Sequence, residues 1–156
     1  YSSRRTEGGG VLLDLSHELD YVLWLLGGWR GLTAVGGKFS TLPIDSDDIY
    51  SLLLTSDTCS IVQININYLD RINRREITII TENCSIKADL VKQTLLVNEG
   101  LTQFKVDRDY TYIMQHRAVI NGEEDNLCTI EDGLKVLRMA DFAQRAAKYG
   151  IWVNNY

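Results

Sequence analysis

Several features that mark particular classes of protein are scarce in this sequence. Its three cysteines, Cys59, Cys84 and Cys128, stand far apart in 156 residues, which argues against a disulfide framework or a zinc knuckle and favours a reducing compartment. No apolar run approaches the ~20 residues of a membrane span, and the polar opening YSSRRTEGGG is unlike a signal peptide. We therefore expect a cytoplasmic protein that does not bind membranes.

Positive charge is also scarce. The formal net charge is −5, and the 16 basic residues are dispersed apart from the pairs Arg4-Arg5 and Arg74-Arg75. Nucleic-acid binding needs a concentrated basic face, so we expect no nucleic-acid partner. The remaining composition, 45% hydrophobic and 24% charged, is typical of a globular domain. We expect residues 1–156 to form one domain with its own core.

Hydrophobic periodicity predicts three helices, which cover Ser16–Leu26, Tyr110–Asn121 and Ile130–Tyr149. Between residues 31 and 106, strand patterns alternate with short turns, and strands joined in this way must be antiparallel. The sequence therefore predicts an α+β fold, with a mostly antiparallel open sheet of about six strands and helices on one face.

The first predicted helix has two different faces. One is aliphatic and should pack on the core, since its members recur at i, i+3, i+4 and i+7: Leu19, Val22, Leu23 and Leu26. The opposite face mixes imidazole, carboxylate and aromatic side chains at the same spacing: His17, Asp20, Tyr21 and Trp24. A solvated face would carry more Lys and Glu, so this second face is typical of a cleft or an interface.

His17 is the centre of the candidate site, because it lies three residues from each of two carboxylates, Asp14 and Asp20. The residues alone leave three interpretations open. His17 is an inert residue at a helix start, or it shares a metal ion with the two carboxylates, which are competent ligands. In the third interpretation it is an acid–base group, held by one of the carboxylates beside Tyr21 and Trp24.

The glycines that precede this helix, Gly8–Gly10, do not predict a cofactor site. A dinucleotide fingerprint follows a buried strand and opens a helix within a βαβ unit. Here the preceding residues are SRRTE, so the glycines are interpreted as a turn into the helix.

The segment 59–68 predicts a surface for self-association. Its alternation places aliphatic side chains on one face and the amides of Gln63, Asn65 and Asn67 on the other. The chain has too few helices to cover both faces of a sheet, so we expect a homo-oligomer that forms through the amide-rich face.

Three segments carry a resemblance to a known family. GGGVLLDLSHELDYVLWLLG, residues 8–27, resembles the opening of the C-terminal domain of the Gfo/Idh/MocA oxidoreductases, the family of glucose–fructose oxidoreductase and inositol dehydrogenase. IVQININYLDRINRREITII, residues 61–80, is similar to its middle, and TIEDGLKVLRMADFAQRAAKYGIWV, residues 129–153, to its closing helix. The resemblance covers nearly the whole chain.

The resemblance implies the substrate-binding and oligomerising domain of an oxidoreductase that uses NAD or NADP and acts on a sugar, polyol or nucleotide sugar. The family's histidine matches His17, which implies proton transfer at the substrate hydroxyl. The family's partner carboxylate usually lies four residues before the histidine, whereas Asp14 lies three before His17, so Asp14 and Asp20 are both kept as candidate catalytic carboxylates. In the family a Rossmann domain holds the cofactor and supplies a catalytic lysine. This chain shows neither a βαβ unit nor that lysine's Glu-Lys-Pro motif. We therefore expect that, alone, it binds no cofactor and is inactive.

Two further functions stay open beside this one. The same fold could serve assembly only, without catalysis, although the face that carries His17 favours an enzyme. A metal-dependent hydrolase is the other alternative, and it needs metal at His17. Arg71, with its neighbours Arg74 and Arg75, is a candidate for binding an acidic or phosphorylated substrate.

Overall fold

The structure is a computed structural model, and it describes residues 2–123 and 127–155. Its contacts divide the chain into two compact units. The first unit comprises Tyr1–Leu69 and Cys128–Tyr156, and the second comprises Asp70–Leu127. Whether residues 1–156 act as a single domain stays a prediction.

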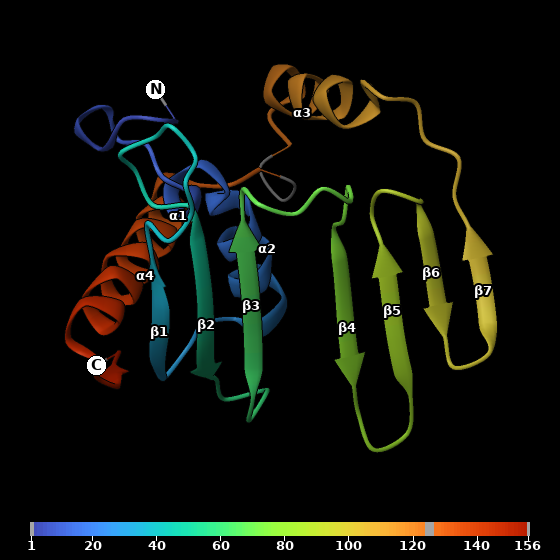
Figure 1. Cartoon of the computed structure of the whole chain (residues 1–156). Coiled ribbons are helices and arrows are strands. Elements are labelled where there is room, and N and C mark those ends of the chain that lie inside the picture. The colour runs from blue at the N-terminus through green and yellow to red at the C-terminus, as the bar shows by residue number, and fades with distance from the viewer. Residues whose placement is uncertain (1, 124–126, 156) are drawn as a thin grey trace. The chain divides into compact units, whose positions relative to one another are not determined.

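The first unit is built on a four-stranded sheet with the order β3-β2-β1-β8 (Figure 1). Its strands are β1 (Gly31–Gly37), β2 (Ile49–Thr55), β3 (Val62–Asn67) and the short β8 (Val153–Asn154). Neighbouring strands are antiparallel, as in the pairs Leu32↔Leu54 and Leu52↔Ile64. Because side chains alternate along a strand, the register gathers the aliphatic residues on one face.

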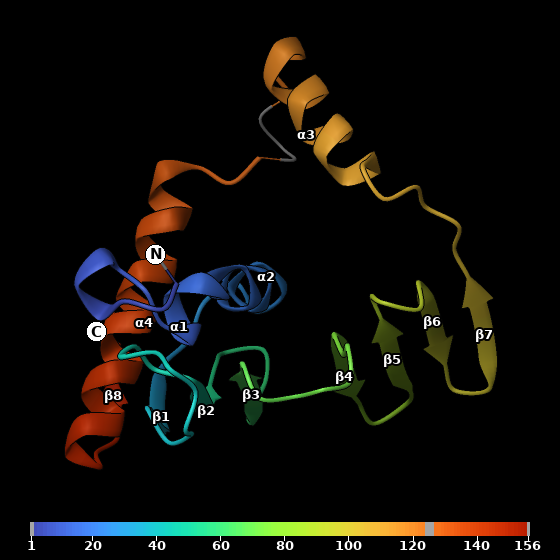
Figure 2. The ribbon, with the colours of Figure 1, turned by 45° about the horizontal axis from the view of Figure 1, so that its top comes forward.

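Helices cover that aliphatic face of the sheet. Figure 2 shows α1 (Val11–Asp14), α2 (Ser16–Leu26) and α4 (Ile130–Tyr149) on one side of β1, β2 and β3. In the chain, a short 3₁₀ turn, η1 (Arg5–Glu7), precedes α1. The core between them is formed by buried apolar side chains from both layers, among them Leu19, Leu32, Leu54, Met139 and Ala143. The buried small residues of α4, Ala140, Ala143 and Ala146, allow this helix to lie close to β1.

The opposite face of the same sheet has no helix on it within the described residues. It presents Thr33, Val35, Ser51, Leu53, Gln63 and Asn65, which line a shallow hollow. Val35 is 71% exposed and Leu53 is also exposed. This mixed surface of apolar, hydroxyl and amide groups is called the open face below.

The second unit is an antiparallel meander of four short strands followed by a helix. The strands are β4 (Glu76–Ile80), β5 (Ser85–Asp89), β6 (Thr94–Val97) and β7 (Gly100–Gln103), in that order across the sheet. The hairpin β6–β7 turns at Asn98, which takes the left-handed conformation with a φ of 53°. The helix α3 (Tyr110–Asn121) ends at Gly122.

The α+β class, the antiparallel pairing and the helices on one face are confirmed. The three predicted helices have the bounds that the periodicity indicated. The strands, however, form two sheets of four rather than one sheet of about six. After β3, the Asn67 and Asp70 side chains accept hydrogen bonds from the backbone N–H groups of Leu69 and Ile72, and these turns end the first ladder.

No helix of the described chain is both long enough and apolar enough to cross a membrane.

Candidate functional site

The N-terminus of α2 carries the candidate histidine, and two short helices place it. The chain leaves the helical conformation at Leu15, so α1 ends at Asp14 and α2 begins at Ser16. Gly27, with a φ of 76°, ends α2 by donating its N–H to the carbonyl of Leu23. Leu19 and Leu23 are buried, so the aliphatic face is anchored in the core as predicted.

His17 pairs with a carboxylate that the sequence analysis did not select. The His17 side chain is 52% exposed, and its Nε2 lies 3.1 Å from Oε1 of Glu18, whose side chain is only 13% exposed. The Tyr21 hydroxyl donates to the other carboxylate oxygen, Oε2, of Glu18. His17, Glu18 and Tyr21 thus form one connected group, called the Glu18 cluster below.

Asp14 belongs to a second group of contacts. Its Oδ1 accepts a hydrogen bond of 3.1 Å from the Ser2 hydroxyl, and its Oδ2 accepts one of 3.0 Å from the Tyr68 hydroxyl. Ser2 lies near the start of the chain and Tyr68 directly after β3. This Asp14 cluster therefore ties three distant segments together beside α2.

Asp20 faces a third partner. Its Oδ1 lies 3.8 Å from the Sγ of Cys128, just before α4 begins. Burial raises the pKa of the Cys128 thiol, and the neighbouring carboxylates of Asp20 and Asp132 raise it further. The thiol is therefore held in its protonated form, which donates to Asp20.

The remaining predicted residues lie apart from these contacts. Trp24, one helical turn beyond Tyr21, is 79% exposed. Arg71 is exposed and belongs to the second unit.

Sequence reasoning missed Glu18, Ser2 and Tyr68. Glu18 and Tyr21 are three residues apart on a helix, a spacing that brings side chains together, so the pair had a signal. Tyr68 directly follows β3, but its partner Asp14 is 54 residues away. No pattern of neighbouring residues in the sequence predicts a contact between residues so far apart.

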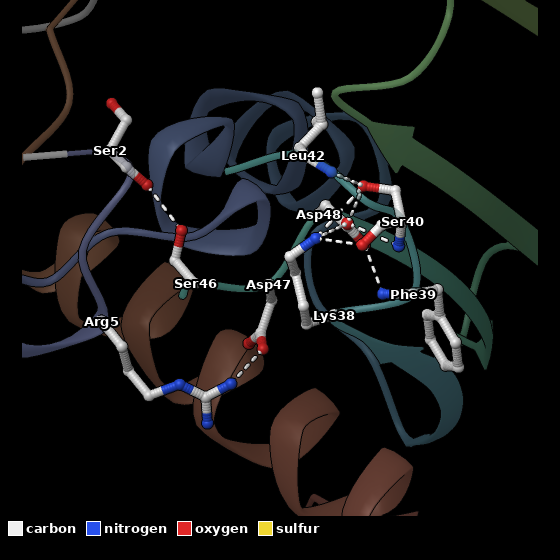
Figure 3. A network of polar contacts seen from close by, with 9 residues as sticks. All are labelled: Ser2, Arg5, Lys38, Phe39, Ser40, Leu42, Ser46, Asp47 and Asp48. Carbon is white, nitrogen blue, oxygen red and sulfur yellow. Dashed lines mark hydrogen bonds and ion pairs between the residues drawn. The ribbon is translucent and has the colours of Figure 1, made fainter. Parts of the chain in front are cut away.

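The polar network of Figure 3 explains how the start of the chain is held in place. Asp48 is fully buried and accepts hydrogen bonds from the backbone N–H groups of Phe39 (2.8 Å) and Ser40 (2.9 Å) and from the Lys38 ammonium (3.1 Å). Burial alone would raise the pKa of Asp48, but these bonds and that from the Ser40 hydroxyl hold it well below its usual range. Asp48 thereby fixes the loop between β1 and β2.

That loop in turn supports the N-terminal segment. Ser46 donates a hydrogen bond of 2.7 Å to the carbonyl of Ser2, and the Arg5 guanidinium lies 2.6 Å from Asp47 (Figure 3). The Val11 N–H donates to the carbonyl of Asp47. The fold thus positions Ser2 and, through it, the Asp14 carboxylate.

The glycines before α1 do not fit a dinucleotide cofactor. Gly10 has a φ of 123°, and a Cβ at this position would lie 3.4 Å from the backbone nitrogen of Asp47. That distance is an ordinary van der Waals contact, so the positive φ is what favours glycine here, and the segment follows η1 rather than a buried strand.

A metal centre finds no support in the described part of the chain, where no three His, Cys, Asp or Glu side chains gather suitably. Asp14, His17 and Asp20 instead contact separate partners: Ser2 and Tyr68 for Asp14, Glu18 for His17 and Cys128 for Asp20. An imidazole that is half-exposed and held by a nearly buried carboxylate is suited to proton transfer at a bound hydroxyl.

Comparison with known proteins was made by sequence and by structure. The family described as the GFO/IDH/MocA C-terminal domain matches residues 1–87. No curated protein sequence matches the chain significantly.

Solved structures resemble the chain over nearly its full length. GenD2 from gentamicin A biosynthesis, in complex with NAD, is 21% identical, with a TM-score of 0.79 over 99% of this chain and 51% of its own. Apo levoglucosan dehydrogenase is 16% identical, with a TM-score of 0.81 over 96% of this chain and 52% of its own.

A third similar structure is the aldose–aldose oxidoreductase from Caulobacter crescentus complexed with glycerol. It is 20% identical, with a TM-score of 0.75 over 95% of this chain and 48% of its own. The chain therefore spans about half the length of these proteins, and at such identities the likeness shows the fold.

Proposed function

The chain belongs to the Gfo/Idh/MocA family, and from this we propose that it is the substrate-binding and oligomerising domain of an NAD(P)-dependent oxidoreductase. The proposed substrate is a sugar, polyol or nucleotide sugar. The observation that carries the proposal is the Glu18 cluster, in which a nearly buried carboxylate holds the half-exposed His17. An assembly domain without catalysis has no use for such a group.

Known relatives agree with this choice. GenD2 was solved with NAD, and the two other similar structures are enzymes named for levoglucosan and aldoses. Gly8–Gly10 follow η1 rather than the buried strand that a dinucleotide fingerprint requires, and we propose that a nucleotide-binding domain outside residues 1–156 holds the cofactor. The chemistry that a bound nicotinamide supplies is acceptance of hydride from the carbon that bears the hydroxyl.

The role of this chain is to accept and return the proton of that hydroxyl. As the C–H bond breaks, negative charge would accumulate on the alcohol oxygen unless a base removes its proton. His17 is that base, and in the reverse direction it returns the proton. The exposed Trp24 and the phenol of Tyr21 are the adjacent surfaces on which a sugar ring can pack.

The open face is the proposed site of self-association. It combines the exposed Val35 and Leu53 with the amides of Gln63 and Asn65, a mixture typical of interfaces between subunits. The cytoplasmic location expected from the cysteines stays a prediction.

The test is His17→Ala in the enzyme that includes the nucleotide-binding domain. We expect kcat to fall ~10²–10⁴-fold, the usual contribution of a general base, with cofactor affinity unchanged. His116→Ala is the matched control, because this exposed second histidine lies on α3 in the other unit. A His17→Ala enzyme with near-normal kcat from pH 6 to 9 would show that His17 is only structural.

A further inference from the structure

Within the proposed function, we infer that Glu18 is the residue that positions His17, and that it makes Nδ1 the ring nitrogen that takes the substrate's proton. The inference deepens the proposed function and rests on it. It departs from the sequence-based expectation, in which Asp14 or Asp20 supported the imidazole.

The first step concerns the burial of Glu18. Its side chain is 13% exposed, and a carboxylate so far removed from water requires donors for its oxygens. The Tyr21 hydroxyl donates to Oε2, and Nε2 of His17 lies 3.1 Å from Oε1, at ion-pair distance. The carboxylate is therefore fixed between two groups of the proposed site.

The second step concerns the position of the hydrogen on His17. A carboxylate only accepts hydrogen bonds, so the ring nitrogen that faces it carries the hydrogen. That nitrogen is Nε2, at 3.1 Å. A neutral imidazole carries one hydrogen, so Nδ1 keeps its lone pair and is the proton acceptor.

The third step concerns the other two carboxylates near α2. Asp14 receives the hydroxyls of Ser2 and Tyr68, and Asp20 receives the thiol of Cys128. Asp14 and Asp20 therefore have donors of their own, and the carboxylate that contacts the imidazole is that of Glu18. Glu18 also lies in the first turn of α2, where the helix dipole favours a negative charge.

The proton passes from the substrate hydroxyl to Nδ1 of His17. The O–H bond of the substrate breaks and an Nδ1–H bond forms on His17, while the electron pair of the O–H bond stays on oxygen and becomes part of the new carbonyl as hydride leaves the carbon. His17 then carries hydrogens on both nitrogens and one positive charge, which the Glu18 carboxylate stabilises at ion-pair distance from Nε2.

His116 provides an internal contrast. Its Nδ1 lies 2.6 Å from the backbone carbonyl oxygen of Tyr112. A carbonyl only accepts, so at His116 the hydrogen resides on Nδ1. The two histidines of the chain thus have opposite tautomers, and ¹⁵N NMR of the neutral imidazoles should show Nε2–H for His17 and Nδ1–H for His116. An Nδ1–H tautomer at His17 would overturn the inference.

The kinetic test is a double-mutant cycle in the enzyme with its nucleotide-binding domain. Turnover is measured with aldoses, levoglucosan and inositols as probes and with NAD and NADP. We expect Glu18→Ala to lower kcat at least ~10-fold, less than the ~10²–10⁴-fold loss for His17→Ala, while KM changes little. In the His17→Ala background, Glu18→Ala should lower kcat no further, because a positioning residue has nothing left to position.

Two variants keep the result interpretable. Glu18→Gln preserves the volume and one accepting oxygen, so we expect it to fold and to retain more activity than Glu18→Ala. Glu131→Ala removes an exposed carboxylate from the first turn of α4. It should leave kcat unchanged, which would show that loss of a first-turn carboxylate does not by itself lower kcat.

The outcomes separate the inference from the proposed function. If His17→Ala leaves kcat normal, the proposed role of His17 as the base is wrong, and the inference about Glu18 fails with it. If His17→Ala lowers kcat but Glu18→Ala does not, or if Glu18→Ala lowers kcat equally in both backgrounds, only the inference is wrong and Glu18 serves the helix alone.

Discussion

The two units of the chain are both four-stranded antiparallel sheets, yet they differ in where their apolar side chains lie. In the first unit, α1, α2 and α4 cover one face of the sheet, and among its described residues 17 apolar side chains form a buried cluster. Among the described residues of the second unit, only Ala118 and Asp89 are buried. Its larger apolar side chains, such as Ile80, Leu101 and Ile120, are exposed.

This difference separates two contributions to stability. Both sheets have complete hydrogen-bond ladders, but a hydrogen bond formed in exchange for water contributes only about 1 kcal/mol net. Burial of apolar surface is the dominant favourable contribution to folding. We therefore expect the first unit to carry the stability of the chain, and a sheet of strands four or five residues long with no buried face to be marginal by itself.

The largest expected effect follows from truncating the core. Leu54→Ala removes a fully buried side chain between β2 and the helices and should lower the free energy of unfolding by about 2–5 kcal/mol. Leu101→Ala in β7 removes the same atoms from a side chain that is 66% exposed and should cost less than about 0.5 kcal/mol. Urea unfolding followed by circular dichroism measures both. Similar losses for the two variants would mean that the second unit has a core of its own.

The second largest effect should come from Asp48→Asn. The neutral amide weakens the bonds from Lys38, Phe39 and Ser40 in a fully buried site, which should cost about 1–3 kcal/mol. Asp57→Asn, at an exposed pair with Arg30, is the control and should have little effect.

The pH dependence of the Asp48 contribution has a defined sign. The pKa of Asp48 is lower in the folded chain than its ordinary value of ~3.9. Its stabilisation is therefore complete above about pH 4 and is lost as the pH falls below that value. The difference in unfolding free energy between the wild type and Asp48→Asn should shrink over this range, and a constant difference would contradict the assignment.

The helix α2 and the strand β8 show which parts of the fold a sequence pattern can predict. The periodicity of residues 16–26 predicted the helix and its buried Leu19 and Leu23, because helix geometry makes sequence spacing equivalent to spatial position. The strands were predicted for a similar reason, because side chains alternate between the two faces of a strand. The two-residue β8 was missed, because it pairs with β1 across more than 120 residues and is too short to have a period.

The candidate site was predictable only in part. His17 was found because a histidine beside carboxylates is rare in this chain. Its partner was misjudged: Glu18 is adjacent in sequence, and successive residues on a helix normally point apart. The structure nevertheless places Oε1 of Glu18 3.1 Å from Nε2 of His17. Asp14 looked equally suitable until the fold placed Tyr68 against it.

A further effect concerns which surface forms the interface between subunits. The open face of the first unit is the proposed site, so Val35→Asp should raise the dissociation constant of the oligomer at least ~10-fold, because it buries a charge against its own copy. Ile80→Asp places the same charge on a side chain of the second unit that is 78% exposed. Sedimentation at micromolar concentration separates the cases. Dissociation by Ile80→Asp but not by Val35→Asp would move the interface to the second unit, and a monomeric wild type would refute self-association.

The smallest effect is expected at Asp89, which is the counterpart of Asp48 in the second unit. Its carboxylate accepts hydrogen bonds from the backbone N–H groups of Val91 (3.1 Å) and Lys92 (2.9 Å) and pairs with the Lys92 ammonium. The bonds from Lys92, followed by that from Val91, lower the pKa of Asp89. Its stabilisation is therefore present above about pH 4 and declines below it. Asp89→Asn should accelerate hydrogen exchange at the Val91 and Lys92 amides, because the neutral amide oxygen in the turn between β5 and β6 is a weaker acceptor than the carboxylate. The exchange of the β1–β2 ladder should not change, since the first unit does not depend on this turn. If Asp89→Asn also accelerates exchange at Leu32 and Leu54, the two units unfold together, and the stability of the chain is shared rather than concentrated in the first.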